Sequence, residues 1–352
     1  MPTTEPERVP DPGAAGFPVV DPATGEAFDE APDQQPGELD TVIDRAQRAW
    51  SGWRADPAAR TTALRAAADA VEAAGEDLAR SLTREQGKPL AESHAEVART
   101  AARLRYFADI APRTRPIDDG RPVRSEVRWR SLGPVAAIVP WNFPLQLAAS
   151  KFAPALAAGN TVVLKPSPFT PLATRMLGSV LAAVLPEDVL TVVTGREPLG
   201  ARLVSHPGFR HVTFTGSVST GRAVARAAAD GPGYFFAPTV LVDVPPDSPV
   251  VTGEQFGPVL PVLPYRSLDE AVEAANGTGF GLGGSVWGTD LDRAEAVAER
   301  LDCGTAWVNH HAELSLAQPF AGVKDSGVGV AGGPWGLYGN LQPFVVHRPR
   351  EA

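Results

Sequence analysis

The part of the sequence that constrains the fold most runs from Ser131 to Gly221. It contains three short β-branched runs, Val135–Val139, Thr161–Leu164 and His211–Thr215, which we interpret as continuous apolar runs rather than alternating ones. Such runs are typical of strands that helices cover on both faces. Ala- and Leu-rich stretches of helical length lie between them. We therefore predict an α/β fold with a parallel sheet wound right-handed.

Polar and special residues follow each run, at the strand ends where a doubly wound sheet binds its ligand. They are Trp141-Asn142-Phe143-Pro144, Lys165-Pro166-Ser167-Pro168, and Gly216-Ser217 at the start of a helix. A helix N-terminus attracts phosphate through its unpaired N–H groups and its positive dipole end. A Gly-Ser pair is also an ordinary N-cap, so it is a weak signal alone. Together with the other two motifs it predicts a nucleotide site.

Composition narrows the class of protein. The 352 residues suffice for two domains, and 43% of them are hydrophobic, which is typical of a globular protein with a sizeable core. A net charge of −9 without a basic stripe argues against a nucleic-acid partner. No run of 18 apolar residues or signal peptide is present, so we expect a cytoplasmic protein without membrane association. The single cysteine, Cys303, excludes a disulfide framework or thiolate metal site within the chain, and we predict no metal.

The motifs PWNFP, VLKPSP and FTGSxxxG, in this order and at this spacing, resemble the cofactor half of the aldehyde dehydrogenase superfamily. The resemblance extends from about Phe17 to Val346 and includes the motifs EQFGP at 254–258 and PFAGVKDSGVG at 319–329. It implies a Rossmann-like doubly wound parallel sheet, NAD or NADP as cofactor, and oxidation of a small aldehyde to a carboxylic acid. It also implies an oligomer, formed by copies of this chain or with a full-length family member.

The resemblance assigns cofactor contacts to positions on both sides of the chain. Lys165 and Ser167 match residues that reach the adenosine ribose, and Gly200 matches one near the adenine. Glu254 and Phe256 match the pair that holds the nicotinamide ribose and packs on the nicotinamide ring. The full set of implied cofactor residues is Pro140, Trp141, Lys165, Ser167, Gly200, Phe214, Gly216, Ser217, Glu254 and Phe256. Pro168 stands where many NAD-preferring members have a Glu, which leaves NAD and NADP both open.

One segment of the family pattern is missing. After Asp230–Gly233 the chain continues with Tyr234–Leu241, which resembles a segment that lies much further on in the family. The gap is on the order of 100 residues, about a domain. In the family this segment supplies the nucleophilic cysteine and the general-base glutamate, whereas the oxyanion donor is retained as Asn142. A sheet trimmed in this way is expected to expose strand edges and apolar helix faces.

Two further groups could substitute for the missing chemistry. Cys303 precedes a predicted strand at Thr305–Asn309, whose five residues span about 16 Å. The resemblance implies a pocket past the Asn309 end of this strand, so the thiol is too far back to act beside Asn142, and we assign it a structural role. His310 and His311 follow Asn309 directly, with Glu313 nearby. A His beside a carboxylate could do acid–base work near neutral pH, or these residues could simply line a pocket or a surface loop.

The sequence predicts four segments: a disordered tail at 1–15, an NAD(P)-binding domain at 16–232 with an oligomerisation-arm strand at 121–132, a reduced catalytic domain at 233–330, and a C-terminal oligomerisation segment at 331–352. The strand at 121–132 could equally be a simple edge strand. Four functions remain open at this point: an active aldehyde dehydrogenase, a non-catalytic dinucleotide binder or oligomer partner, an enzyme with acid–base chemistry in a remodelled pocket, and a degenerate deletion product.

Overall fold

The computed structural model describes residues 16–110, 112–117, 123–215, 239–242, 244–245, 247–257 and 259–349. The chain divides into two compact units, Met1–Asp109 with Ser131–Gly216, and Ile110–Arg130 with Ser217–Ala352. Each unit is described by itself below. The predicted tail at 1–15 and the helix predicted to begin at Gly216-Ser217 lie outside the described residues.

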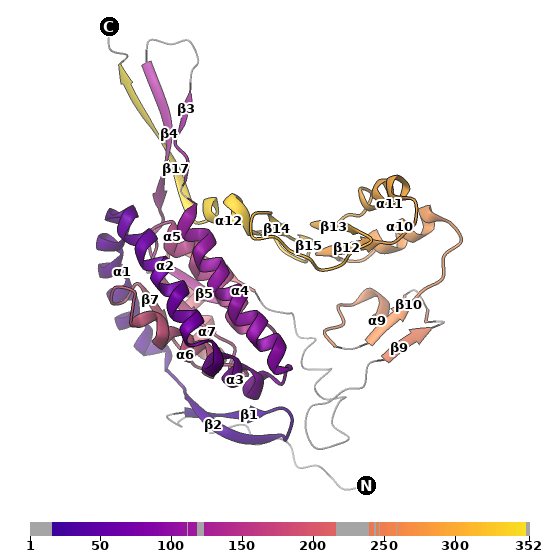
Figure 1. Cartoon of the computed structure of the whole chain (residues 1–352), viewed down its shortest axis with the longest axis horizontal. Coiled ribbons are helices and arrows are strands. Elements are labelled where there is room, and N and C mark those ends of the chain that lie inside the picture. Colours follow the sequence, from indigo (N-terminus) through magenta and orange to yellow (C-terminus); the bar gives the residue numbers. More distant parts are fainter. Residues whose placement is uncertain are drawn as a thin grey trace. The chain divides into compact units, whose positions relative to one another are not determined.

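The first unit is built on a four-stranded parallel sheet, as the apolar runs predict (Figure 1). Its strands are β7 (Leu190–Val192), β6 (Val162–Lys165), β5 (Val135–Ile138) and β8 (His211–Phe214), in the order β7-β6-β5-β8. Every residue of β6 is buried, because helices cover both faces. Along the chain, β6 and β7 are added in turn on one side of β5, and the chain then crosses over to place β8 on the other side of β5.

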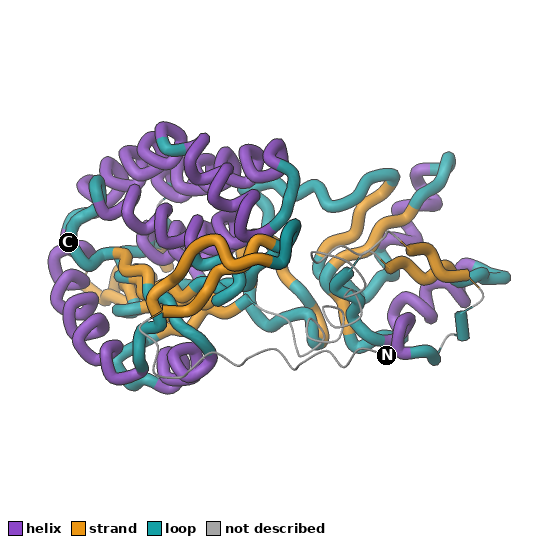
Figure 2. Tube along the Cα trace, turned by 90° about the horizontal axis from the view of Figure 1, so that it is seen from below, coloured by secondary structure: helices purple, strands orange, loops and turns teal. Residues whose placement is uncertain are grey.

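Helices cover the two faces of this sheet in layers (Figure 2). One face packs on α1 (Leu39–Ala55) and α7 (Glu197–Ser205), through a core that joins Ala136 and Val163 of the strands to Ile43 and Leu203. The other face packs on α5 (Pro144–Ala157) and α6 (Leu172–Ala182). A further layer over these two consists of α2 (Pro57–Ala73), α3 (Gly75–Gln86) and α4 (Leu90–Asp109). Helices α5 and α6 follow β5 and β6 in the chain, where the Ala- and Leu-rich stretches of helical length lie.

An antiparallel hairpin of β1 (Gly16–Asp21) and β2 (Glu26–Pro32) precedes these helices. The chain after it, through the short helix η1 (Pro36–Glu38), is tied to the loop between β7 and α7. Asp33 and Arg196 form a half-buried ion pair, and the Gln34 side chain accepts a hydrogen bond from the Thr194 N–H at 2.8 Å. The hairpin is thereby fixed to the first unit.

The second unit contains short strand pairs rather than one continuous sheet, among the residues that the structure describes. Two pairs are parallel: β9 (Thr239–Val242) with β10 (Val259–Val262), and β12 (Gly283–Val286) with β13 (Thr305–Val308). Two are antiparallel: β11 (Phe280–Gly281) with β15 (Val323–Lys324), and β14 (Phe320–Ala321) with β16 (Val330–Ala331). The helices are α9 (Pro249–Thr252), α10 (Leu268–Asn276), α11 (Leu291–Ala298) and α12 (Gly333–Tyr338).

The parallel pairs of the second unit leave apolar side chains uncovered. Parallel strands are normally buried in larger sheets, and an isolated two-stranded sheet is marginally stable. Leu260 and Val262 of β10 are nevertheless 61% and 46% exposed. This agrees with the expectation that the second unit exposes strand edges and apolar surface.

A separate three-stranded sheet of the second unit has the order β17-β4-β3. It consists of β3 (Arg115–Ile117), β4 (Val123–Ser131) and β17 (Leu341–Pro349), and Figure 1 shows β17 beside β4. The interpretation of 121–132 as an edge strand is therefore wrong, because β4 has a partner on each side. An oligomerisation role for this strand and for 331–352 remains a proposal, as do the predicted domain boundaries.

Candidate functional site

The carboxyl ends of β5, β6 and β8 lie in one row along the edge of the first unit's sheet. Ile138 of β5 is in register with Lys165 of β6 on one side and with Phe214 of β8 on the other. Hydrogen bonds continue the row, since the Val139 N–H donates to Lys165 O and the Thr215 N–H donates to Ile138 O, both at 3.1 Å. The loops that follow these strands carry the predicted site residues, so the sheet brings them to a common edge.

The order β7-β6-β5-β8 reverses between β5 and β8. In open α/β sheets this switch point creates a crevice at the carboxyl ends, because the chain leaves the two strands toward opposite faces. The loop with Pro140, Trp141 and Asn142 leaves β5 at this point, and all three residues are half-buried. Gly216 and Ser217, and the side chain of Phe214, lie outside the described residues.

The structure brings together two residues predicted to face the adenosine. Lys165 ends β6, and its side chain is almost fully buried. Gly200 lies in α7, where an added Cβ would be 3.8 Å from the Lys165 Cε, so the two residues adjoin and no side chain separates them. Ser167 follows at the start of the next loop, and its Oγ accepts a hydrogen bond from the Phe169 N–H at 3.3 Å. Lys165, Gly200 and Ser167 thus lie at or just after the carboxyl end of β6 and beside it in α7.

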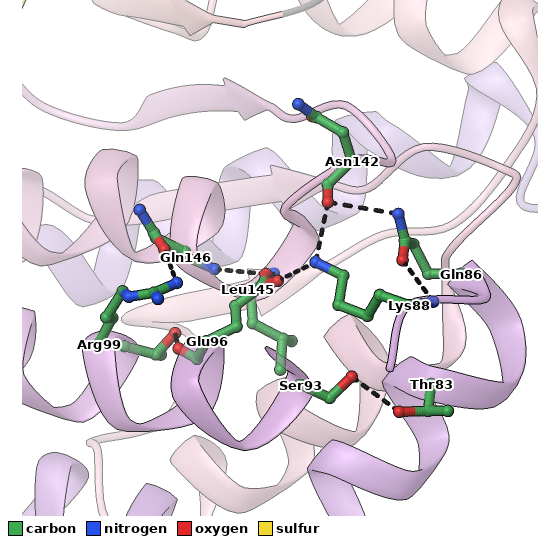
Figure 3. Close-up of polar contacts among 10 residues, drawn as sticks. Thr83, Gln86, Lys88, Ser93, Glu96, Arg99, Asn142, Leu145 and Gln146 are labelled. Carbon is green, nitrogen blue, oxygen red and sulfur yellow. Dashed lines mark hydrogen bonds and ion pairs between the residues drawn. The ribbon is translucent and has the colours of Figure 1, made fainter. Parts of the chain in front are cut away.

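A network of buried polar groups fixes the loop that carries Asn142 (Figure 3). The Asn142 main-chain carbonyl accepts hydrogen bonds from Lys88 Nζ at 3.0 Å and from Gln86 Nε2 at 3.4 Å. Lys88 Nζ also pairs with Glu96 Oε2 at 2.5 Å, and the Glu96 side chain is fully buried. The second Glu96 oxygen accepts the N–H groups of Leu145 and Gln146 at 2.9 and 3.0 Å. Gln86 and Lys88, at the connection between α3 and α4, thus hold the Asn142 loop from one side, a role that the sequence alone does not indicate.

The Asn142 side chain fits a polar ligand. Its Oδ1 is buried and has no hydrogen-bond partner among the described residues. Buried polar atoms are almost always paired, so an unpaired one marks a place where a ligand group or water completes the hydrogen bonding. The oxygen and nitrogen of an amide exchange positions by a flip, so this buried end can accept or donate. A donor here is what the predicted oxyanion role requires.

Neither α5 nor α6 has a capping side chain at its own N-terminus. Glutamates from the outer helix layer take that place. Glu96 of α4 caps α5, and Glu85 of α3 caps α6 by accepting the N–H groups of Leu172 and Ala173 at 2.7 and 2.9 Å. A helix N-terminus that already holds a protein carboxyl group is not available to a phosphate. The N-termini of α5 and α6 are therefore occupied by protein carboxyl groups, and the phosphate site predicted at Gly216-Ser217 lies outside the described residues.

The two remaining predicted cofactor residues, Glu254 and Phe256, belong to the second unit. They lie in the loop between α9 and β10, where Glu254 is exposed and Phe256 is half-buried. Their approach to the nucleotide stays a prediction.

The histidines after β13 form two separate pairs rather than one cluster. His310 Nε2 lies 2.5 Å from Glu313 Oε2, and His311 Nδ1 lies 2.6 Å from Ser285 Oγ. Asn309 has a positive φ of 51° and closes the turn by hydrogen bonding to the main chain of Gly288. His310, His311 and Glu313 are all exposed, which favours their interpretation as surface-loop residues over acid–base chemistry.

Cys303 lies in the turn between α11 and β13, at the amino end of the strand. It is half-buried, and its Sγ donates a hydrogen bond to Thr305 O at 3.3 Å. Among the described residues, no three His, Cys, Asp or Glu side chains gather in a way that could hold a metal ion. Within the same ranges, none of the helices combines the length and the apolar character that a membrane crossing requires.

The sequence model of the aldehyde dehydrogenase family matches residues 9–232 and 227–343. Geranial dehydrogenase of Castellaniella defragrans is 31% identical over 443 residues, which cover 90% of this chain and 92% of that protein. Succinate-semialdehyde dehydrogenase of Paenarthrobacter nicotinovorans is 31% identical over 434 residues, covering 87% and 95%. Among solved structures, betaine aldehyde dehydrogenase of Staphylococcus aureus, in complex with NAD+, superposes with a TM-score of 0.89 at 24% identity, covering 96% of this chain and 92% of that chain.

The fold and these matches define an α/β protein with a Rossmann-like, doubly wound nucleotide-binding half. This chain belongs to the aldehyde dehydrogenase family. Both alignments are longer than the 352 residues of this chain, so the relatives carry residues that it lacks. The two segments matched by the family model overlap at 227–232, which agrees with the gap predicted after Asp230–Gly233.

Proposed function

We propose that this chain binds NAD or NADP along the carboxyl edge of the β7-β6-β5-β8 sheet. The observation that supports this most is the convergence of Lys165, Gly200 and the Asn142 loop at one sheet edge, next to the point where the strand order reverses. We place the phosphates at Gly216-Ser217, as the sequence motif predicts, since the N-termini of α5 and α6 already hold carboxyl groups. Solved relatives bound to NAD+ support the same ligand class.

The adenosine half of the ligand would lie over β6. Lys165 can donate to the ribose hydroxyls, and Gly200 leaves room for the adenine because it has no side chain. Pro168 offers no carboxylate to repel a 2′-phosphate, so NAD and NADP both fit. When bound, the dinucleotide supplies a hydride acceptor.

Calorimetric titration with NAD and NADP tests this proposal. We expect saturable binding of at least one of them, and we expect Lys165→Ala to weaken it about tenfold or more, which is the effect of losing one charged hydrogen bond. Lys324→Ala is a suitable control, because Lys324 is a lysine of the second unit that bonds to the main chain at Asn276 and Thr278. Absence of heat and of a thermal shift with both dinucleotides would show the proposal to be wrong.

We further propose that the chain does not oxidise aldehydes by itself. The reaction of the relatives, as the resemblance describes it, needs a thiolate beside the oxyanion donor. The one thiol of this chain, Cys303, donates to its own turn at the amino end of β13. The protein would then be a dinucleotide-binding member of the family, acting alone or as a partner of another family member.

Absorbance at the wavelength of the reduced cofactor checks this second proposal. With small aliphatic and aromatic aldehydes at high enzyme concentration, we expect no reduction of NAD or NADP above the buffer rate. We also expect alkylation of Cys303 to leave dinucleotide binding unchanged. Aldehyde-dependent reduction that disappears in Cys303→Ser, or in Asn142→Ala, would contradict the proposal and restore the family reaction.

A further inference from the structure

The loop between α3 and α4 reaches the candidate site with two side chains. Gly87 ends α3 in the left-handed region, with a φ of 86°, and its N–H donates to Thr83 O at 2.8 Å. The next residue, Lys88, is held by a hydrogen bond from its own N–H to Gln86 Oε1 at 3.0 Å. This tight turn aims Gln86 and Lys88 together at the Asn142 carbonyl, so both lone pairs of that oxygen have a donor.

The Lys88 ammonium is held on its other side by buried charge. Its side chain is 9% exposed, and its partner Glu96 is fully buried. Glu96 also binds the first free N–H groups of α5, through Leu145 and Gln146. The ring of Phe143 lies over the ammonium, 4.2 Å from its centroid. Two contacts therefore fix the chain around Asn142 and Phe143. Lys88 binds the Asn142 carbonyl, and Glu96 caps the helix α5 that follows Phe143 (Figure 3).

The Asn142 main-chain carbonyl, in the loop that follows β5, could point in either of two directions. Turned toward the crevice, it would place an electron-rich oxygen against the ligand. Lys88 instead holds the Asn142 carbonyl turned toward the α3–α4 layer. The side-chain amide of Asn142 keeps a buried oxygen without a protein partner among the described residues. With the main-chain carbonyl held in this direction, the Asn142 amide is a group of this loop that can hydrogen-bond a ligand carbonyl.

We propose that Lys88 is a positioning residue for the ligand end that lies over the β5 loop, and that Glu96 acts through it. This inference rests on the proposed dinucleotide binding. The Asn142 loop follows β5, and β5 pairs with β6, so the nicotinamide end of a dinucleotide whose adenosine lies over Lys165 is within reach of this loop. Lys88 therefore selects for the nicotinamide carboxamide without touching it, and it has no influence on the adenosine end.

Comparison of NAD with ADP-ribose tests this role, because ADP-ribose lacks only the nicotinamide base. The variant is Lys88→Met with Glu96→Gln, which removes both buried charges together and leaves an oxygen that can cap α5. We expect the affinity for NAD to fall about tenfold, the effect of one charged hydrogen bond, and the affinity for ADP-ribose to change less than about twofold. Gln86→Ala leaves the ion pair intact and should shift the same ratio in the same direction, by about two- to threefold.

The control variant is Lys324→Met, whose ammonium also holds main-chain carbonyls and pairs with Asp302, in the second unit. It should keep the NAD to ADP-ribose ratio of the wild type. Two outcomes would assign Lys88 a purely structural role and overturn the inference. One is an equal fall in the affinities for NAD and ADP-ribose in the double variant. The other is a ratio of the two affinities that stays unchanged in both the double variant and Gln86→Ala. If wild-type protein binds neither ligand, the proposed function fails instead, and the two failures are distinct.

Discussion

We expect Glu96→Ala to lower the free energy of unfolding by about 3–5 kcal/mol, the cost of breaking a buried ion pair by removing one partner. The substitution leaves the Lys88 ammonium buried without its counter-charge. It also leaves the N–H groups of Leu145 and Gln146 at the start of α5 without their acceptor. Urea unfolding followed by far-ultraviolet circular dichroism measures this loss, because the long helices of the chain belong to the first unit.

Two further variants separate the charge of Glu96 from its shape. Glu96→Gln keeps an oxygen that can cap α5 but removes the charge. It should therefore lower the free energy of unfolding by less than Glu96→Ala does. Glu76→Ala removes an exposed carboxylate that pairs with Arg80 at 2.5 Å, and it should change the unfolding free energy by less than about 1 kcal/mol. Equal effects of Glu96→Ala and Glu76→Ala would mean that the buried network contributes no more than a surface pair.

The strands of the first unit could be predicted because their environment is uniform. Apolar runs at 135–139, 161–164 and 211–215 correspond to β5, β6 and β8 within a residue or so at each end. Strands covered on both faces need apolar side chains at every position, so the signal does not depend on register. The family motifs assigned both Lys165 and Gly200 to the adenosine end, and the structure places the two residues side by side.

The polar network behind Asn142 could not be predicted in the same way. Glutamate in a helix is usually exposed, yet Ser93, Glu96 and Thr100 of α4 are fully buried. Their spacing of three and four residues, next to Val97 and Leu104, was the available signal, because it places them on or beside the apolar face. The main-chain partners of Glu96 in α5 lie about 50 positions further along the chain, and only the packed fold identifies them. The central position of β4 depends likewise on β17, more than 200 residues away.

Glu85 should give the protein an unusual dependence of stability on pH. Burial raises the pKa of its carboxyl to about 8 from an ordinary 4.5, against the lowering effect of the Ala173 and Leu172 N–H groups, and the nearby charge of Glu96 raises it further. Between these two pH values the folded protein holds more protons than the unfolded chain. The free energy of unfolding therefore falls as pH rises through this window, by up to about 1.4 kcal/mol per pH unit for one proton.

Other buried groups titrate with the opposite sign, so the test compares wild type with Glu85→Gln. Burial, and then the charge of Lys151, lowers the pKa of His211 below its ordinary 6.5, which makes stability rise with pH below that value. Burial lowers the pKa of Lys151 to about 8, so stability should rise again from there toward 10.5. Glu85→Gln keeps a neutral side chain at the cap. It should therefore remove only the fall in the free energy of unfolding between about pH 4.5 and 8. Urea unfolding at intervals from pH 5 to 9 measures both profiles, and identical slopes between pH 5 and 8 would show that Glu85 is ionised throughout and that its two N–H partners outweigh its burial.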